Sequence, residues 1–309
     1  MAVQQGVAIL GVFVADLAFR ASRQPLIGET LIGSGFKMGP GGKGSNQAVA
    51  AARAGAKVSF IAKIGNDAFG DIAQATWKRE GITARVIKSE TEPTGAAYIF
   101  VSDVNGDNAI IVVPGAGAAI TVAEVAAAKD AITSAKVFVT QLEQSIDAAR
   151  HGLQIARAAG VITLFNPAPA AAIADDIFPL CDYVIPNEGE AAALTGLAVA
   201  TVDEARKAGD ILLRKGAGSA LITLGGRGSL LHSSSQSVLI EPFKAGKVVE
   251  TAGAGDSFVG AFATALADGL PPVQAAQFAS AAAGISVTRP GTAPSMPTRA
   301  EIERLLAGL

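Results

Sequence analysis

The sequence predicts an α/β protein with a doubly wound, mainly parallel sheet and a second, much smaller β-sheet. Short apolar runs rich in β-branched residues alternate with longer amphipathic stretches along a chain of 309 residues. This alternation is typical of parallel strands that are buried between two layers of helices. Because a chain of this length can bury one large core, we expect residues 1–309 to form a single domain.

The apolar run 7–14 is predicted to be the first strand. It lacks the basic segment and the small-residue cleavage site that a signal peptide would have. Further buried parallel strands are expected at 58–61, 137–139, 161–165, 183–185 and 220–223. Helices are expected at 69–80, 122–132, 147–159, 188–194 and 203–215.

Four strand-like segments break the alternation, because no helical stretch separates the members of each pair. They lie at about 12–20 and 31–38, and at about 95–102 and 108–114. Residues 102–107, SDVNGD, connect the second pair and are typical of a β-hairpin turn. We expect the four segments to form a small sheet over one edge of the main domain.

Charge, hydropathy and cysteine content argue against several classes of protein. A net charge of −2 and a pI near 5.8 give no basic surface of the kind that binds nucleic acid. Mean hydropathy is +0.40, but no apolar run reaches the length of a membrane span. The single Cys181 cannot form an internal disulfide, which fits a reducing compartment and predicts a cytoplasmic protein. Cys181, Trp77, His151 and His232 show no ligand spacing and are expected to be structural residues.

Residues 251–258, TAGAGDSF, carry the strongest chemical signal in the chain. Gly253, Ala254 and Gly255 allow a sharp turn whose N–H groups point one way, and an apolar helical stretch follows. A helix N-terminus of this kind suits a phosphoryl group. Asp256 would lie beside that anion, where it either caps the helix or takes a proton from the hydroxyl that attacks the phosphate.

Residues 39–47, GPGGKGSNQ, form a second glycine-rich turn before a helical run. The glycine spacing matches the dinucleotide-binding fingerprint. Against that interpretation, the preceding segment is a poor buried strand and no acidic residue clearly ends the next strand. It is not a Walker A loop either, because Lys43 is followed by glycine rather than by Ser or Thr. Lys43 and Asn46 instead offer donors for hydroxyl groups, and the glycines permit close approach to a ligand.

Taken together, the two loops make the chain resemble the ribokinase branch of the PfkB-type carbohydrate kinases. The likeness runs from about Ile9 to Pro297, and further motifs lie in the order of that family. They are QLE at 141–143, NPAP at 166–169, PNEGE at 186–190, LITLG at 221–225 and VTRPG at 287–291. The resemblance implies that the small sheet is a lid, that two lids often pair to form a homodimer, and that Asp256 is the catalytic base.

The resemblance also implies a set of residues that bind the sugar. Asp16 would hold two sugar hydroxyls, since a carboxylate accepts two hydrogen bonds in fixed geometry. The other implied contacts are Gly42, Lys43, Asn46 and Glu143, with apolar lid residues Ala97, Ile99 and Val112 over the ring.

One position in this sugar site departs from the family. Ribokinases usually carry asparagine where this chain has Val14. A sugar hydroxyl left unpaired there would cost about 1–3 kcal/mol. This predicts a preference for a sugar with fewer or rearranged hydroxyls.

On the nucleotide side, the resemblance implies ATP and Mg²⁺. Mg²⁺ keeps several waters and bridges phosphates, so one carboxylate near those waters suffices, and Glu190 matches it. Contacts to ATP would come from Asn187, Thr223, Gly225, Gly228 and Ser280. A monovalent-cation loop pair would comprise Glu250, Ala252, Ser286, Arg289, Gly291 and Ser295. Relatives usually carry Asp in place of Glu250, so the sequence alone does not decide whether potassium activates.

The sequence therefore predicts an ATP-dependent kinase for the primary hydroxyl of a pentose, with D-ribose converted to ribose 5-phosphate. Kinases for a deoxypentose, another sugar, a ketose phosphate or a nucleoside are alternatives. A degenerate kinase that only binds a sugar, as a sensor or partner protein, is an alternative of another class. The intact segment 253–256 distinguishes this last case, because sugar binding alone does not require it.

Overall fold

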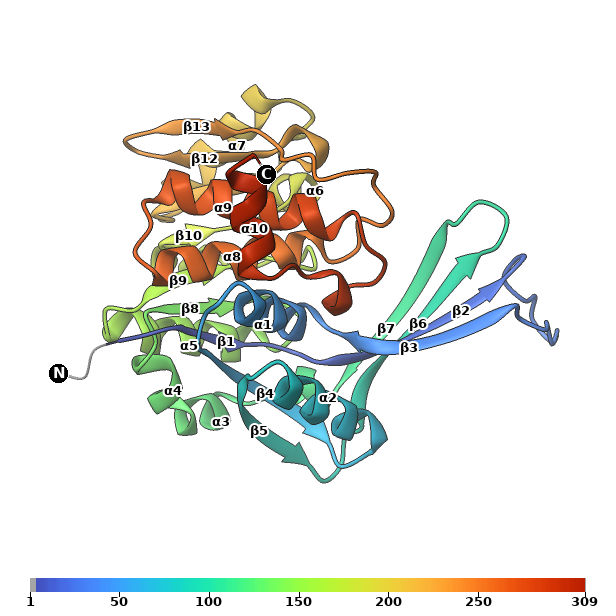
Figure 1. Cartoon of the computed structure of the whole chain (residues 1–309). Helices are drawn as coiled ribbons and strands as arrows, with labels where there is room; N and C mark the ends of the chain where they lie inside the picture. The colour runs from blue at the N-terminus through green and yellow to red at the C-terminus, as the bar shows by residue number, and fades with distance from the viewer. Residues whose placement is uncertain (1–3, 309) are drawn as a thin grey trace.

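The computed structural model describes residues 4–308 and places nine strands in one large sheet (Figure 1). The strand order is β13-β12-β11-β10-β9-β8-β1-β4-β5. Strands from β11 to β5 in this order are parallel, whereas β12 and β13 add an antiparallel edge. The strands are β1 Val7–Leu10, β4 Val58–Gly65, β5 Thr83–Ser89, β8 Val137–Thr140, β9 Ile162–Phe165, β10 Tyr183–Val184, β11 Ser219–Thr223, β12 Ser229–Ser233 and β13 Ser237–Ile240.

Helices cover both faces of this sheet, which confirms the predicted doubly wound fold. The two faces are visible in β1, where Ile9 packs in one buried cluster with Phe262 of α8, and Leu10 packs in the other with Leu153 of α5. The helices are α1 Lys43–Arg53, α2 Ala68–Arg79, α3 Val122–Ala127, α4 Lys129–Thr133, α5 Ile146–Ala158, α6 Glu188–Thr195, α7 Val202–Arg214, α8 Ala254–Ala267, α9 Pro272–Ser286 and α10 Arg299–Leu306.

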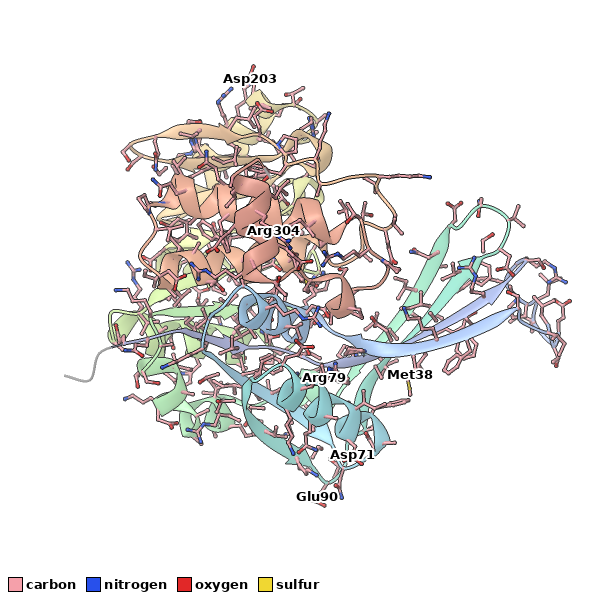
Figure 2. All side chains as sticks on the ribbon, viewed as in Figure 1. Met38, Asp71, Arg79, Glu90, Asp203 and Arg304 are labelled. Carbon is pink, nitrogen blue, oxygen red and sulfur yellow. The ribbon has the colours of Figure 1, made fainter. Side chains whose placement is uncertain are left out.

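The four lid strands form a separate sheet in the order β3-β2-β6-β7. They are β2 Val14–Ala21, β3 Gly35–Gly41, β6 Thr94–Ser102 and β7 Asn108–Gly115. Figure 1 shows that this sheet projects away from the main body rather than lying flat over its edge. Met38 of β3, labelled in Figure 2, has a side chain that is about half exposed. Strand β3 begins at Gly35, later than the segment expected at about 31–38. The turn before it ends at Ser34, whose N–H donates to the carbonyl of Arg20.

The expected helix at 122–132 is two shorter helices in the structure. Ala128 lies between α3 and α4 with ψ of 15°, which ends the regular helical backbone there. Its side chain is buried in the same cluster as α5. The interruption therefore lets both short helices keep an apolar face against the core.

Three of the residues that were expected to be structural have identifiable packing roles. Trp77 is buried between Phe13 and Phe60, and its Nε1 donates to Ser45 Oγ at 2.9 Å, which ties α2 to α1. Cys181 is buried, and burial raises the pKa of its thiol. His232 lies in β12 between Asp210 and Ser237. None of the helices within residues 4–308 is long and apolar enough to cross a membrane.

Candidate active site

The candidate active site lies where the carboxyl ends of the central strands meet the N-terminal ends of α1, α6 and α8. Ligands of open parallel sheets bind at this end, near the point where the strand order changes direction. Here β1 lies between β8 and β4, so the order changes at β1. Several of the predicted motifs line a pocket at this point. Its lining includes Lys43, Asn166, Asn187, Glu190, Thr223, Gly253, Gly255 and Asp256.

The predicted anion-binding turn lies at the start of α8. Gly253 precedes the helix with φ of 79°, a backbone conformation that residues with a Cβ rarely adopt. The N–H of Ala254 donates to the carbonyl of Thr251 at 3.2 Å. The N–H groups of Gly255 and Asp256 lie in the first helical turn, where helical acceptors are lacking. Gly255 and Asp256 therefore offer the donors for an anion, and Ala254, included by the sequence analysis, contributes less.

Asp256 does not cap α8. The N-terminus of α8 has no side-chain cap, and the Asp256 carboxylate turns instead toward α1. Its Oδ2 accepts from Asn46 Nδ2 and its Oδ1 accepts from Gln47 Nε2, each at 3.0 Å. Burial raises the pKa of Asp256, whereas Lys43 and the two amide donors oppose the rise. A carboxylate beside the predicted anion turn is placed where a general base for the attacking hydroxyl would have to lie.

The pocket gathers acidic groups around one lysine. The N–H of Lys43 donates to Glu143 Oε2 at 2.7 Å. Burial raises the pKa of Glu143 to about 7 and that of Asp16 to about 6, the latter with added repulsion from Asp256. Burial alone would lower the pKa of Lys43, but the surrounding carboxylates raise it overall. The amine therefore stays charged, ready to attract phosphate or hydroxyl oxygens.

The glycines at 41 and 42 make room for the protein's own atoms, and their approach to a ligand stays a prediction. A Cβ at Gly41 would lie 2.3 Å from Asp16 Oδ1 and 2.4 Å from its other two carboxyl atoms. Gly42 has φ of +86°, and a Cβ there would lie 2.5 Å from the carbonyl oxygen of Val12. Gly41 thus leaves room for the Asp16 carboxylate, and Gly42 lets the backbone before α1 lie against the backbone of residues 12–14.

The lid register places the predicted sugar residues in one row. Asp16 of β2 pairs with Ala97 of β6, which pairs with Val112 of β7. Residues paired in this way face the same side of a sheet. Ile99 lies two positions beyond Ala97 and shares that side. Val14 is buried and packs with Val12 and Ala97 in a small apolar cluster beside Ile99.

The residues predicted to bind the nucleotide fall into two groups. Asn187 and Glu190 form a reciprocal capping box at the start of α6, in which Glu190 Oε2 accepts from Asn187 N at 2.8 Å. Thr223 lies beside Asn187 through an isolated bridge and is followed by a turn that contains Gly225 and Gly228. Ser280 lies apart from the pocket lining, and its Oγ donates to Glu241 O at 3.1 Å.

The predicted cation loops lie against each other. Glu250 Oε2 accepts from Gly291 N at 2.8 Å, so the side chain that is longer than aspartate joins the two loops directly. Side chains of the remaining members are bound elsewhere, with Arg289 paired to Glu301 at 2.6 Å. Ser286 Oγ and Ser295 Oγ donate to the carbonyls of Ala283 and Thr292. Backbone oxygens would therefore have to supply most ligands of a cation here. Ala252, two residues after Glu250, could offer only its backbone carbonyl.

Four buried or partly buried residues near the site were not predicted. Gln47, Asn166 and Gln141 lie inside the motifs quoted above, but no part in the surroundings of Asp256 was predicted for them. Gln141 donates to Gln47 Oε1 at 2.6 Å. Thr292 Oγ1 lies 3.4 Å from Asp16 Oδ2 and 3.2 Å from the carbonyl of Pro40, which links the second cation loop to the lid. The signal for these residues was their place within the quoted motifs or, for Thr292, directly after VTRPG at 287–291.

The carboxylates of the site fit a magnesium ion that is carried by phosphates. Among residues 4–308, no group of three or more His, Cys, Asp or Glu side chains is arranged to hold a metal. Glu190 is buried and uses Oε2 for the α6 cap, and its second oxygen can accept from a metal-bound water. The pKa of Glu190 is raised by burial, against the effect of Lys43. The functional roles of all these site residues stay predictions.

Known proteins resemble the chain over nearly its full length. The family model for pfkB carbohydrate kinases matches residues 4–299. The ribokinase of Haemophilus influenzae is 38% identical over 95% of each chain, and the deoxyribokinase of Salmonella typhi is 34% identical over 97% of this chain and 98% of its own. The structure of Arabidopsis thaliana ribokinase complexed with ribose and ATP superposes with a TM-score of 0.92 at 29% identity and covers 99% of both chains. The chain belongs to the PfkB family of carbohydrate kinases, phosphotransferases with an alcohol group as acceptor.

Proposed function

We propose that this carbohydrate kinase transfers the γ-phosphoryl group of ATP to the primary hydroxyl of a free pentose, with D-ribose as the main substrate and ribose 5-phosphate as the product. The observation that carries the proposal is the placement of Asp256 between the α8 anion turn and the Asn46 amide. The primary hydroxyl of a sugar bound at the row Asp16, Ala97 and Val112 could there contact both the base and the γ-phosphate. The ribokinases among the relatives, and the relative solved with ribose and ATP, support ribose as the sugar.

The chain's residues account for each part of the transfer. Asp16 accepts from sugar hydroxyls, and the buried Asn46 Oδ1, which has no partner among residues 4–308, is a further acceptor for them. Asp256 takes the proton of the attacking hydroxyl while the hydroxyl oxygen bonds to the γ-phosphorus. The bond from the γ-phosphorus to the β-phosphate oxygen breaks, which releases ADP. The Gly255 and Asp256 amides and Lys43 stabilise the charge on the transferred group. Mg²⁺ would neutralise the β- and γ-phosphates, with Glu190 holding its waters.

A coupled assay of ADP release over pentoses, deoxypentoses, hexoses, fructose phosphate and nucleosides tests this assignment. We expect D-ribose to give the highest kcat/KM or to share it with 2-deoxyribose. Activity on no sugar at all would favour the binding-protein alternative, and preference for a nucleoside would remove the pentose assignment.

A deoxypentose is the second candidate substrate, and Val14 is the observation that favours it. Val14 is an apolar residue two positions from Asp16 on the same side of the lid, where it is buried against Val12 and Ala97. A deoxyribokinase is also among the relatives at 34% identity.

Replacing Val14 with asparagine is expected to raise kcat/KM for ribose relative to 2-deoxyribose by up to about tenfold, since the new amide can pair one ring hydroxyl. Steady-state kinetics with both sugars measure this ratio, and Val14→Leu serves as an apolar control of larger size. An unchanged ratio in Val14→Asn would show that this side chain does not contact the sugar.

Metal and cation dependence follow from the same site. Turnover is expected to stop when Mg²⁺ is removed, because charge develops between the β- and γ-phosphates. Potassium is expected to raise turnover by ordering the Glu250–Gly291 contact against the anion turn. Assays at constant ionic strength compare potassium with tetramethylammonium, and equal rates in the two salts would argue against a working cation site.

A homodimer through the lid and a cytoplasmic location complete the proposal. Exposed apolar side chains gather on the side of the lid opposite the Asp16 row, and a second lid would cover them. They are Phe19, Phe36, Met38, Ile111 and Val113. The use of ATP and the single buried Cys181 support the cytoplasm.

A further inference from the structure

A chain of buried amides connects the sheet to Asp256. Gln141, which follows β8, donates to Gln47 Oε1 at 2.6 Å. Gln47 Nε2 donates to Asp256 Oδ1 and to Asn166 Oδ1, each at 3.0 Å. Asn166, which follows β9, donates through Nδ2 to the carbonyl of Ile185 at 2.7 Å. Gln47 and Gln141 are completely buried.

These contacts allow only one orientation of the Gln47 amide. Its nitrogen faces two acceptor oxygens and its oxygen faces a donor. Rotation by half a turn would put Gln47 Oε1 against the oxygens of Asp256 and Asn166 and lose both hydrogen bonds. Asn166 cannot turn either, because its own nitrogen is required by the Ile185 carbonyl.

One atom of this amide network lowers the stability of the fold. Gln141 Oε1 is buried without a hydrogen-bond partner among residues 4–308. A buried polar atom without a hydrogen-bond partner destabilises the folded state. Two glycines make room for it, since a Cβ would lie 2.5 Å from this oxygen at Gly11 and 3.0 Å at Gly44. Gln141 is joined to Asp256 through Gln47, and an unfavourable polar group in the network that holds the proposed base indicates a functional reason.

We propose that Gln47, locked by Gln141 and Asn166, is a positioning residue that fixes the Asp256 carboxylate for proton abstraction. The inference rests on the proposed role of Asp256 as the base. Because the Gln47 amide cannot turn, its bond to Oδ1 fixes the orientation of the Asp256 carboxylate. Oδ2 then lies beside Asn46, which the proposed function places at the sugar. Gln47 also favours the ionised form against the effect of burial.

The variant Gln47→Met tests the proposal, because methionine fills a similar volume without a donor. We expect kcat to fall on the order of tenfold with little change in KM for sugar or ATP. The missing bond favours the protonated acid, so the acidic limb of the kcat profile should move to higher pH by about one pH unit. This variant keeps the other titratable residues that face Asp256, which are Lys43, Asp16, Glu143 and Glu190.

A matched control is Gln144→Met. Gln144 is a buried glutamine beside the network that donates to Thr140 Oγ1 and to the carbonyl of Gln141 but does not contact Asp256. A similar loss of thermal stability in both variants, with the pH profile displaced only in Gln47→Met, supports a positioning role. A profile displaced in neither variant, or equally in both, overturns it.

A readout without turnover separates this proposal from the proposed function. Carbon NMR of labelled aspartate reports the titration of Asp256, which Asp256→Asn identifies by loss of its signal. A higher pKa of Asp256 in Gln47→Met supports the proposal even if no tested sugar is phosphorylated, and an unchanged pKa overturns it. Normal turnover in Asp256→Asn would instead refute the function on which the inference rests.

Discussion

Replacing Asp256 with asparagine is expected to lower kcat by about 10²-fold or more while ATP and sugar still bind. General base catalysis contributes about 10²- to 10⁴-fold, and the amide cannot take the proton of the attacking hydroxyl. The amides at the start of α8 remain, so phosphate binding should persist. Steady-state kinetics give kcat, and calorimetric titration of sugar and ATP measures the retained affinity.

The site can accept this asparagine with one local change, the rotation of a neighbouring amide. Gln47 cannot turn its amide, so the new side-chain oxygen would face Gln47 Nε2. The new NH₂ would then face Asn46, whose Oδ1 is buried and unpaired within the described part of the chain. Rotation of the Asn46 amide satisfies both groups. Loss of activity in this variant would therefore report chemistry rather than a collapsed site.

A control on the same helix strengthens the test. Asp268 follows the last turn of α8 and pairs with Arg299 at the surface. Asp268→Asn removes a carboxylate from the same helix without touching the pocket, so kcat should stay within about twofold, as is usual for surface changes. Near-normal turnover in Asp256→Asn would contradict the assignment of the base.

Most of the large sheet was predictable, because its buried strands are continuous β-branched runs. The strands that were not predicted, β5, β12 and β13, lie at or next to the edges of the sheet. In β5, exposed and half-buried residues alternate, and β12 and β13 form an antiparallel pair after the last parallel strand. Such strands are stabilised mainly by pairing with a neighbouring strand, so their own sequence shows a weaker pattern of buried residues.

The candidate site was predictable to the level of its loops but not of its contacts. Glycine-rich turns before α1 and α8 marked both ends of the site, since backbone conformation is encoded locally. The bond from Gln47 to Asn166 spans 119 residues and depends on how α1 packs on the sheet. The same holds for Thr292 and Asp16, which are 276 residues apart. No local pattern specifies such pairs.

Replacing Gly41 with alanine is expected to raise KM for the sugar by about 10²-fold. The new Cβ would lie 2.3–2.4 Å from all three carboxyl atoms of Asp16, so this side chain must leave its present position. Hydrogen bonds to a charged group contribute about 1.5–3 kcal/mol, which corresponds to roughly 10- to 150-fold in affinity. Because Asp256 and the anion turn lie in the main domain, KM for ATP should change little.

The lid itself provides the matched control. Gly39 pairs with Asp16 across the same two strands, yet a Cβ there would meet no atom within 4 Å. Gly39→Ala should therefore leave KM for the sugar within about twofold, as expected for a change that touches nothing. If Gly41→Ala behaves like Gly39→Ala, the Asp16 carboxylate does not bind the sugar from its present position. A rise confined to Gly41→Ala would place the sugar hydroxyls at Asp16, because both variants add the same methyl group to the same strand.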